Sequence, residues 1–167
     1  MLKVFKTMAE LPFGKMMEIY AQSNQEHGEQ WLQESKERQI ELAEQEVYAY
    51  LRQCFFTRPG SRCFLWEEEG RAICALRCES YGDGLLLTAL ETHPDYRGRG
   101  IATKLLTAVL ETLEPGNVYA HIRKDNLSSL KVHSRCGFLK VKSGARMLDG
   151  SYSGTHDTYR KVIEKSR

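Results

Sequence analysis

A short glycine-rich basic loop stands directly before an amphipathic helical pattern in the stretch Leu85–Leu110. The loop and the first helical turn comprise Arg97, Gly98, Arg99, Gly100, Ile101, Ala102 and Thr103. A helix start exposes backbone N–H groups and the positive end of the helix dipole, so it attracts anions. Glycines let the backbone approach a phosphate closely, and arginines add charge that pairs with it. The spacing therefore predicts a phosphate-binding site.

Two common nucleotide-binding loops do not fit these residues. The Walker loop GxxxxGK(S/T) is absent from the sequence. The dinucleotide fingerprint GxGxxG is met only in part, because Thr103 stands where the third glycine or alanine belongs. The next strand-like run, Asn117–Ile122, also lacks the acidic residue that would hold a ribose. A dinucleotide site of the Rossmann type is therefore disfavoured.

A second motif begins 26 residues after Gly100. It reads NLSS at Asn126–Ser129 and ends, after a helical stretch, in CGF at Cys136–Phe138. The first loop resembles the R/Q-x-x-G-x-G/A loop of the GNAT superfamily, the acyl-coenzyme A-dependent N-acetyltransferases, and Leu90–Tyr96 resembles that family's usual lead-in. The second motif resembles the family's N-x-x-S, helix and G-F. The specific resemblance covers about Leu85–Phe138.

The resemblance implies a role for each matching position and implies acetyl-coenzyme A (acetyl-CoA) as the acyl donor. The basic loop and helix start would bind the pyrophosphate, mainly through main-chain N–H groups. The fourth strand would offer backbone groups to the pantetheine arm at its end, through Leu90, Glu91 and Thr92. Asn126 and Ser129 would hold the pantetheine from its other side. The two central strands would splay apart to admit the thioester, and free N–H groups there would stabilise the oxyanion.

The catalytic candidates implied by the resemblance are Glu91, His121 and His133. Many GNAT enzymes have a tyrosine acid seven residues after the motif asparagine, where this chain has His133; a histidine, with an ordinary pKa near 6.5, can also donate a proton. For the base, His121 stands where the branch that acetylates protein amino termini has a glutamate. Glu91 lies at the acyl end of the fourth strand and is slightly favoured by position. The glutamate of the histone-acetylating branch is replaced here by Leu86.

Each of these residues also has a purely structural explanation. The two loop glycines could serve only a tight turn, and the two arginines could be solvated surface charges. Asn126 is a good helix N-cap in its own right. His133 could be a hydrogen-bonded residue on a half-buried helix face, and Glu91 or His121 could merely line the site or relay water.

The acceptor side is less clearly marked in the sequence. Two segments carry acidic and aromatic groups: Glu26, His27, Glu29, Trp31 and Glu34 in one, and Asp149, Tyr152, His156 and Asp157 in the other. They could attract a cationic amine or could simply be solvated loops. The resemblance implies a primary amine of a small-molecule or peptide acceptor, which the sequence does not identify.

The elements that must position these residues follow from hydrophobic periodicity. Strands are expected at Leu2–Lys6, Arg62–Glu67, Arg71–Glu79, Gly84–Thr92, Asn117–Ile122, Phe138–Met147 and Tyr152–Val162. Helices are expected after Pro12, from about Lys36 to before Arg58, at Ile101–Leu113 and at Asn126–Cys136, with a loop or irregular turn over 23–35. This order predicts an α/β (α+β) fold with a mixed, mostly antiparallel sheet, splayed central strands and helices on both faces. No linker interrupts it, so residues 1–167 are expected to form a single domain.

The composition of the chain argues against several classes of binding partner. The 167 residues carry 24 Lys and Arg against 22 Asp and Glu, a net charge of +2, which argues against a nucleic-acid partner. A membrane partner is not expected, because no apolar run approaches the length of a membrane-spanning helix and the amino terminus lacks a signal-peptide core. Five cysteines without a CxxC pair favour a reducing, cytoplasmic location. His133 and Cys136 have HxxC spacing but no second ligand pair, so no metal site is expected.

The leading hypothesis is an enzyme that transfers an acetyl group from acetyl-CoA to an amine, with a homodimer left open. The alternative is a non-catalytic acyl-CoA-binding sensor or interaction domain on the same fold. That alternative draws on the missing tyrosine at His133 and the missing glutamate at Leu86.

Overall fold

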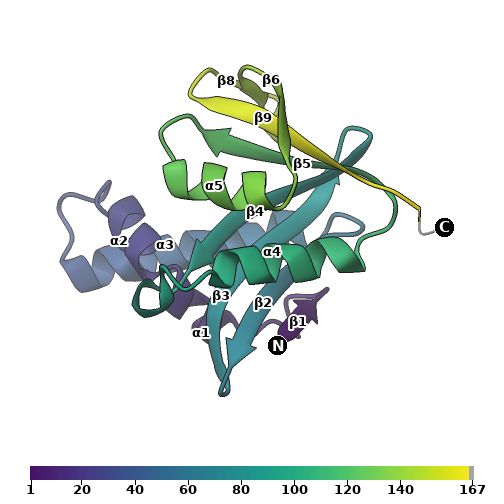
Figure 1. Ribbon diagram of the computed structural model, residues 1–167. Helices are drawn as coiled ribbons and strands as arrows, with labels where there is room; N and C mark the ends of the chain where they lie inside the picture. The colour runs from purple at the N-terminus through teal and green to yellow at the C-terminus, as the bar shows by residue number, and fades with distance from the viewer. Residues whose placement is uncertain (166–167) are drawn as a thin grey trace.

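Seven strands form one mixed sheet in the computed structural model, which describes residues 1–165 (Figure 1). Their order across the sheet is β1-β2-β3-β4-β5-β9-β6. The strands are β1 Leu2–Phe5, β2 Arg62–Glu68, β3 Arg71–Tyr81, β4 Gly84–Thr92, β5 Gly116–Arg123, β6 Leu139–Lys142 and β9 His156–Ile163. Every neighbouring pair is antiparallel except β4 and β5. The predicted mixed, mostly antiparallel sheet is therefore confirmed.

Helices cover both faces of this sheet, as predicted (Figure 1). They are α1 Phe13–Ile19, α2 Ala21–Gly28, α3 Lys36–Tyr50, α4 Ile101–Thr112 and α5 Leu127–Arg135, with a π-helical turn at Leu51–Phe55 and a 3-10 turn at Pro94–Tyr96. One core cluster packs α4 against residues such as Phe64 and Leu87. The other packs α1 and the π-helical turn against Leu65 and Ala75. Because neighbouring strand residues face opposite ways, Phe64 and Leu65 serve the two cores separately.

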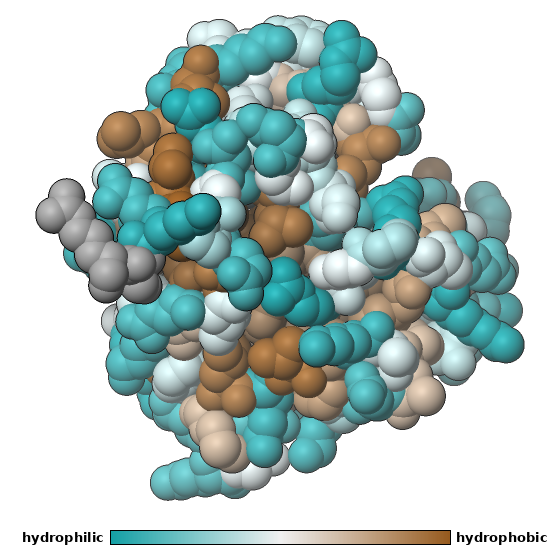
Figure 2. Space-filling model, turned by 90° about the vertical axis from the view of Figure 1, so that its right-hand side faces the viewer, coloured by the Kyte–Doolittle hydropathy of each residue, from teal (hydrophilic) through white to brown (hydrophobic). Residues whose placement is uncertain are grey.

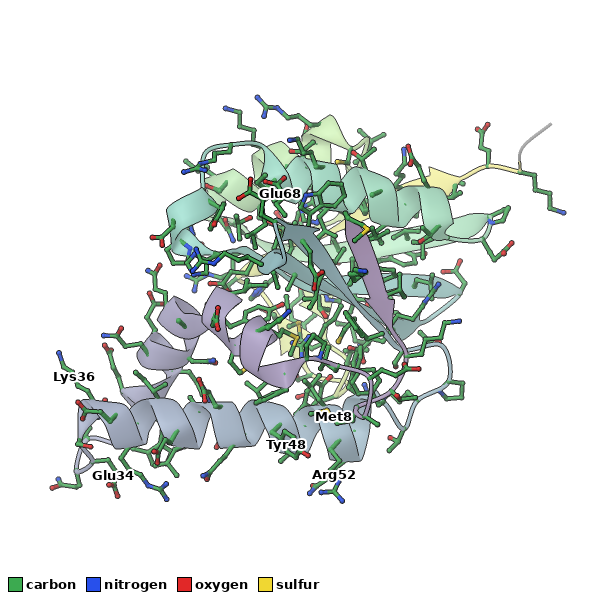
Figure 3. All side chains as sticks on the ribbon, turned by 90° about the horizontal axis from the view of Figure 1, so that it is seen from below. Met8, Glu34, Lys36, Tyr48, Arg52 and Glu68 are labelled. Carbon is green, nitrogen blue, oxygen red and sulfur yellow. The ribbon has the colours of Figure 1, made fainter. Side chains whose placement is uncertain are left out.

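The helix α3 begins and is oriented as its sequence pattern indicates. The side chain of Ser35 accepts a hydrogen bond from the backbone N–H of Arg38 at 3.2 Å, which caps the helix start. Ala43 is buried, so the side of the helix that carries it is the inner one. In Figure 3, Arg52 of the turn that follows points away from the rest of the molecule, whereas the Tyr48 ring of α3 lies 5.2 Å from that of Phe13 in α1. Arg38 and Glu41 form an exposed ion pair, so the charged side of this helix faces solvent.

Residues 23–35, expected as a loop or an irregular turn, include most of the regular helix α2, from Ser23 to Gly28. This helix is almost entirely polar, so periodicity could not reveal it. Contacts with its neighbours hold it instead: the Asn24 amide donates to the Met17 sulfur at 3.4 Å. A Cβ on Gly28 would lie 2.7 Å from the Gln39 carbonyl oxygen, so only glycine allows this close approach to α3.

The last two predicted strands are each broken in two. Beyond β6, the chain bends at Gly144, which has a positive φ of 78°, and forms the hairpin β7 Ala145–Arg146 and β8 Tyr152–Ser153 before β9. Two bonds hold the bend against β9: Gly144 N–H donates to Asp157 at 3.0 Å, and the Thr158 hydroxyl donates to Gly144 O at 2.8 Å. The bend brings the hairpin to the C-terminal end of β3, beside the turn into β4, where the Tyr81 hydroxyl donates to Arg146 O.

The strands β4 and β5 are paired along only part of their length. Parallel pairing joins Gly84–Leu87 to Asn117–Ala120 and then stops. Beyond that point β4 continues beside β3, while β5 continues beside β9 as far as Arg123. Figure 1 shows the two strands drawing apart toward their C-terminal ends. The predicted splay of the central strands is confirmed.

The outer surface carries few extended apolar areas in the view of Figure 2, where hydrophobic residues lie in small groups between hydrophilic ones. Over residues 1–165, no helix combines the length and the apolar composition needed to cross a bilayer. All five cysteines are free thiols, and three of them are buried.

Candidate functional site

A β-bulge interrupts β4 where it leaves β5. Arg77 of β3 lies opposite Thr88, but Ala75 lies opposite Glu91, so β4 contains one residue more than β3 between these pairs. Ala89 adopts a positive φ of 53°, which is strained for a residue with a side chain. The Tyr20 hydroxyl donates to the Ala89 carbonyl oxygen at 2.5 Å and holds the bulge.

The bulge decides which way Glu91 points. Strict alternation from Thr88 would turn Leu90 toward the face of α1–α3 and Glu91 toward α4. Instead Leu90 packs against the α4 core, and Glu91 contacts α2 on the other face. The extra residue therefore brings Glu91 to the face on which Thr88 lies.

The carboxylate of Glu91 is half-buried and hydrogen-bonded. The Ser23 hydroxyl of α2 donates to Oε2 at 2.6 Å, and an Arg97 nitrogen lies 3.5 Å from Oε1. Burial raises the pKa of Glu91 above its ordinary value, although Ser23 and Arg97 oppose that shift. A carboxylate in this state is a stronger base than a solvated one.

The arginines of the basic loop are engaged by the protein. Arg97 donates to Thr92 O at 3.1 Å and to the Gln22 side chain at 2.7 Å, which ties the loop to the end of β4 and to α2. Arg99 donates to Asp95 O and lies 5.2 Å from the Tyr96 ring centre. The anion-binding capacity of the loop therefore resides chiefly in its backbone.

The backbone of this loop leaves the start of α4 uncovered. Gly98 and Gly100 have positive φ values of 77° and 74°, and a Cβ added to either would meet no atom within 4 Å. Gly100 is the N-cap of α4 and supplies no side-chain cap. The first N–H groups of α4, including those of Ala102 and Thr103, therefore lack intrahelical acceptors and remain available to an anion.

A surface hollow continues from this loop along α4. It is lined by Trp66, Gly100, Thr103, Lys104, Thr107, Ala108, Glu111 and Arg135. Two of these side chains, Lys104 and Arg135, are cationic and would add to the attraction of a polyanionic ligand.

The start of α5 is held by its own side chains. Asn126 caps the helix by accepting the Ser129 N–H at 3.1 Å. His133 lies one turn further, with Nδ1 2.8 Å from the Ser129 carbonyl oxygen and its ring 5.1 Å from that of Phe138. Because a carbonyl oxygen only accepts, Nδ1 carries the proton, and burial lowers the pKa of His133. The neutral ring then has no proton on Nε2, so this geometry favours a packing role over that of an acid.

His121 lies on β5 at the point of separation from β4. Its ring contacts Tyr81 edge to face at 5.1 Å, and its buried Nε2 has no hydrogen-bond partner within residues 1–165. Burial, together with nearby His156, lowers the pKa of His121 below its ordinary value of 6.5. The imidazole is therefore largely neutral at pH 7 and can accept a proton.

The structure groups the predicted residues in two sets. Glu91 and His121 lie on the face of α1–α3, beside the gap in pairing, whereas Asn126, Ser129 and His133 belong to α5 on the opposite face. Two of the groups expected to attract an acceptor are paired within the chain: His27 with Glu46, and Asp157 with Lys140. Among residues 1–165, no group of three or more His, Cys, Asp or Glu side chains is placed to hold a metal ion.

Comparison with known proteins adds independent evidence. The model of the acetyltransferase (GNAT) family matches residues 16–138, which is most of the chain. Among curated protein sequences, none matches significantly. The PaiA N-acetyltransferase of Thermoplasma acidophilum, solved with coenzyme A, is 14% identical with a TM-score of 0.64, over 98% of this chain and 99% of that one.

Two further structures share the fold. The ribosomal-protein-S18-alanine N-acetyltransferase of Escherichia coli is 15% identical with a TM-score of 0.60, over 100% of this chain and 97% of that one. The yncA protein of Salmonella typhimurium, solved with acetyl-CoA, is 14% identical with a TM-score of 0.51, over 80% and 77% of the two chains. At these identities the likeness establishes the fold, and the family match establishes the relationship. The chain therefore belongs to the GNAT acetyltransferase family.

Proposed function

We propose that this protein is an N-acetyltransferase that transfers the acetyl group of acetyl-CoA to a primary amine. The observation that carries the proposal is the separation of β4 from β5 directly beside a glycine-rich helix start. The first feature leaves room between strands for an extended thioester arm, and the second binds a pyrophosphate. The solved relatives that contain coenzyme A or acetyl-CoA support this donor.

The residues present fit such a donor. In our proposal the pyrophosphate binds at Arg97–Thr103, chiefly through N–H groups of Gly98, Gly100 and the first turn of α4. The pantetheine arm runs along Leu90–Thr92 on one side and meets the start of α5, with Asn126 and Ser129, on the other. The acetyl carbonyl then lies near the bulge, where backbone N–H groups can stabilise its developing negative charge.

The transfer itself needs a neutral amine. The amine nitrogen attacks the thioester carbonyl carbon, an N–C bond forms, and the C–S bond breaks. The nitrogen loses a proton to a base, and the departing thiolate takes up a proton, so the products are an N-acetylated amine and coenzyme A thiol. A thiol of ordinary pKa near 8.5 is a tolerable leaving group, which lessens the need for a strong acid. Holding the amine close to the thioester in the gap between β4 and β5 also accelerates the transfer.

Glu91 is the proposed base, with His121 as the second candidate. Both are on the acceptor face; burial raises the pKa of Glu91, which makes it a stronger base, and lowers the pKa of His121, which keeps its imidazole neutral but makes it a weaker base. A base acts when deprotonated, so kcat/KM should rise as pH increases through its pKa. We expect the activity to increase between pH 5 and pH 7 in the wild type.

His121→Gln is expected to lower kcat/KM by less than about tenfold and to leave the acid limb of the pH profile in place. The measurement is kcat/KM from pH 5 to pH 9. His156→Gln is the matched control: it removes the neighbour that lowers the pKa of His121, so only a base at His121 would move the limb to higher pH. A loss near a hundredfold, with the limb gone, would assign the base to His121 instead.

Gly100→Ala is expected to weaken coenzyme A binding about tenfold. An alanine in the left-handed conformation costs about 1–2 kcal/mol, so the loop relaxes away from the geometry that presents its N–H groups. Calorimetric titration with coenzyme A measures the effect. Gly14→Ala in α1 is the control, since a Cβ there meets no atom within 4 Å and its φ is not positive. An unchanged affinity in Gly100→Ala would remove the loop from the donor site.

One observation favours a second function. The hydrogen bond from His133 Nδ1 to Ser129 leaves the expected acid position without a proton on Nε2. A non-catalytic acyl-CoA sensor would need no such proton. Thiol release from acetyl-CoA in the presence of a panel of amines distinguishes the two, because a sensor binds the donor without consuming it. The cytoplasmic location and the homodimer remain predictions.

A further inference from the structure

We propose that the acceptor amine also carries a carboxylate, as an amino acid does, and that Arg77 binds this carboxylate. The inference rests on the proposed N-acetyltransferase function and names its substrate class. Acetyl transfer would join the acetyl carbon to the amino nitrogen of this acceptor, release coenzyme A as the thiol, and leave the carboxylate unchanged.

Arg77 stands in a row of three polar residues across the centre of the sheet. It lies opposite Thr88 in the β3–β4 pairing. The residues before Thr88 and His121, Leu87 and Ala120, are paired with each other and buried in the α4 core. Because strand side chains alternate, Thr88 and His121 point to the other face, together with Arg77. The row therefore runs across the acceptor face to the point where β4 and β5 separate.

The guanidinium of Arg77 has aromatic neighbours but no anionic one. Its Cζ lies 5.4 Å from the ring centre of Tyr50 and 5.8 Å from that of Phe55. The Nε atom is buried and has no hydrogen-bond partner within residues 1–165. None of the ion pairs formed by these residues includes Arg77. A buried hydrogen-bond donor without a partner costs free energy. A ligand that offers this donor a hydrogen-bond acceptor atom removes that cost and is therefore bound more tightly.

The nearby carboxylate of Glu79 is already bound by another arginine. Glu79 is two residues further along the same face of β3, and its side chain is only 1% exposed. An Arg58 nitrogen lies 2.6 Å from Oε1, and the Tyr50 hydroxyl donates to Oε2 at 3.4 Å. Glu79 is thus paired with Arg58, and Arg77 has no ion-pair partner among residues 1–165. A single carboxylate on the ligand balances the charge of Arg77, whereas a phosphate dianion would need a further cation.

The rest of the row suits the same ligand. Thr88 Oγ1 and His121 Nε2 are buried polar atoms without hydrogen-bond partners among residues 1–165, as is Arg77 Nε. A hydroxyl can donate to a carboxylate, and a neutral imidazole nitrogen can accept from an ammonium group. An acceptor with its carboxylate at Arg77 and its amine toward His121 and the bulge would satisfy all three atoms.

The test compares acceptors that differ only in the carboxylate. We would measure kcat/KM with acetyl-CoA for matched pairs such as L-phenylalanine and phenethylamine, or 4-aminobutyrate and butylamine, each at several pH values to allow for amine ionisation. The expected result is a preference of about tenfold or more for the carboxylate-bearing member of at least one pair.

Variants then assign the preference to Arg77. Arg77→Met is expected to abolish it, and Arg77→Lys to retain part of it, since lysine keeps the charge but lacks the planar fork. The affinity for coenzyme A should stay unchanged in both, which confines the effect to recognition of the acceptor. Arg62→Met is the matched control: Arg62 Nε is also buried and unpartnered within residues 1–165, but it lies on the α4 face, 5.8 Å from the Phe64 ring.

Each outcome is decisive. A preference that Arg77→Met removes and Arg62→Met keeps supports the inference. Turnover of amines without any preference, or with a preference that survives Arg77→Met, overturns the inference while the proposed function stands. Turnover of no acceptor at all, despite tight binding of coenzyme A, contradicts the proposed function and the inference with it. Thermal unfolding of each variant separates a loss of recognition from a loss of folding.

Discussion

Glu91→Gln is expected to lower kcat/KM about a hundredfold at pH 7, because it removes the group that takes the proton from the attacking amine. Glutamine keeps the shape of the side chain and can still accept the hydrogen bond from Ser23. The fold and the affinity for coenzyme A should therefore change little. The measurement is kcat/KM across pH, with the affinity determined separately by titration.

Ser23→Ala provides the matched control for Glu91. The Ser23 hydroxyl lowers the pKa of Glu91, so its removal should raise that pKa further and move the acid limb of the profile to higher pH. Activity should then recover as pH increases. His133→Phe should retain most of the rate, since His133 is hydrogen-bonded to its own helix. Wild-type rates and an unmoved limb in both Glu91→Gln and Ser23→Ala would remove Glu91 from the mechanism.

Gly84→Ala is expected to reduce the free energy of unfolding by about 3 kcal/mol. Gly84 is the first residue of β4 to pair with β5, and a Cβ there would overlap the carbonyl oxygen of Asn117. The obstacle is backbone, so it cannot be relieved by a side-chain rotation. The two strands must move apart at the end where they are joined, which also disturbs the gap at the other end.

Chemical denaturation measures this change, and Gly14→Ala is again the control. That substitution adds a Cβ to a helix in open space and should stabilise the protein by up to about 1 kcal/mol. If Gly84→Ala were as stable as the wild type, the close approach of β4 and β5 at Gly84 would be refuted.

Local patterns were sufficient to predict most of the fold. The run before Arg97 predicted β4 because it is an apolar stretch that follows the glycine turn at Gly82–Gly84, and the pattern from Ile101 onward predicted α4 because it is amphipathic and stops before Pro115-Gly116. The turn at Glu69-Gly70 likewise separated β2 from β3, and both residues do adopt positive φ. Polar α2 could not be found in this way, since contacts through Gly28 and Asn24 with distant residues hold it.

The site was harder to predict than the fold. The sequence placed Glu91 at the end of a strand, but only the bulge at Ala89 turns it toward α2, and no residue type marks that bulge. Arg77 gave no signal at all, because one arginine within a strand pattern is usually solvated. Its importance depends on pairing with Thr88 and on Glu79 being bound to Arg58. These are long-range contacts that local sequence does not encode.

The central claim is that the gap between β4 and β5 holds a thioester for attack by an amine. The most direct measurement incubates the protein with acetyl-CoA and a panel of amines that includes amino acids, and follows both free thiol and acetylated product by mass spectrometry. We expect thiol and N-acetyl product to appear in equal amounts, only with an amine present, and far more slowly with Glu91→Gln. Binding of coenzyme A without any N-acetyl product above the uncatalysed rate would contradict it.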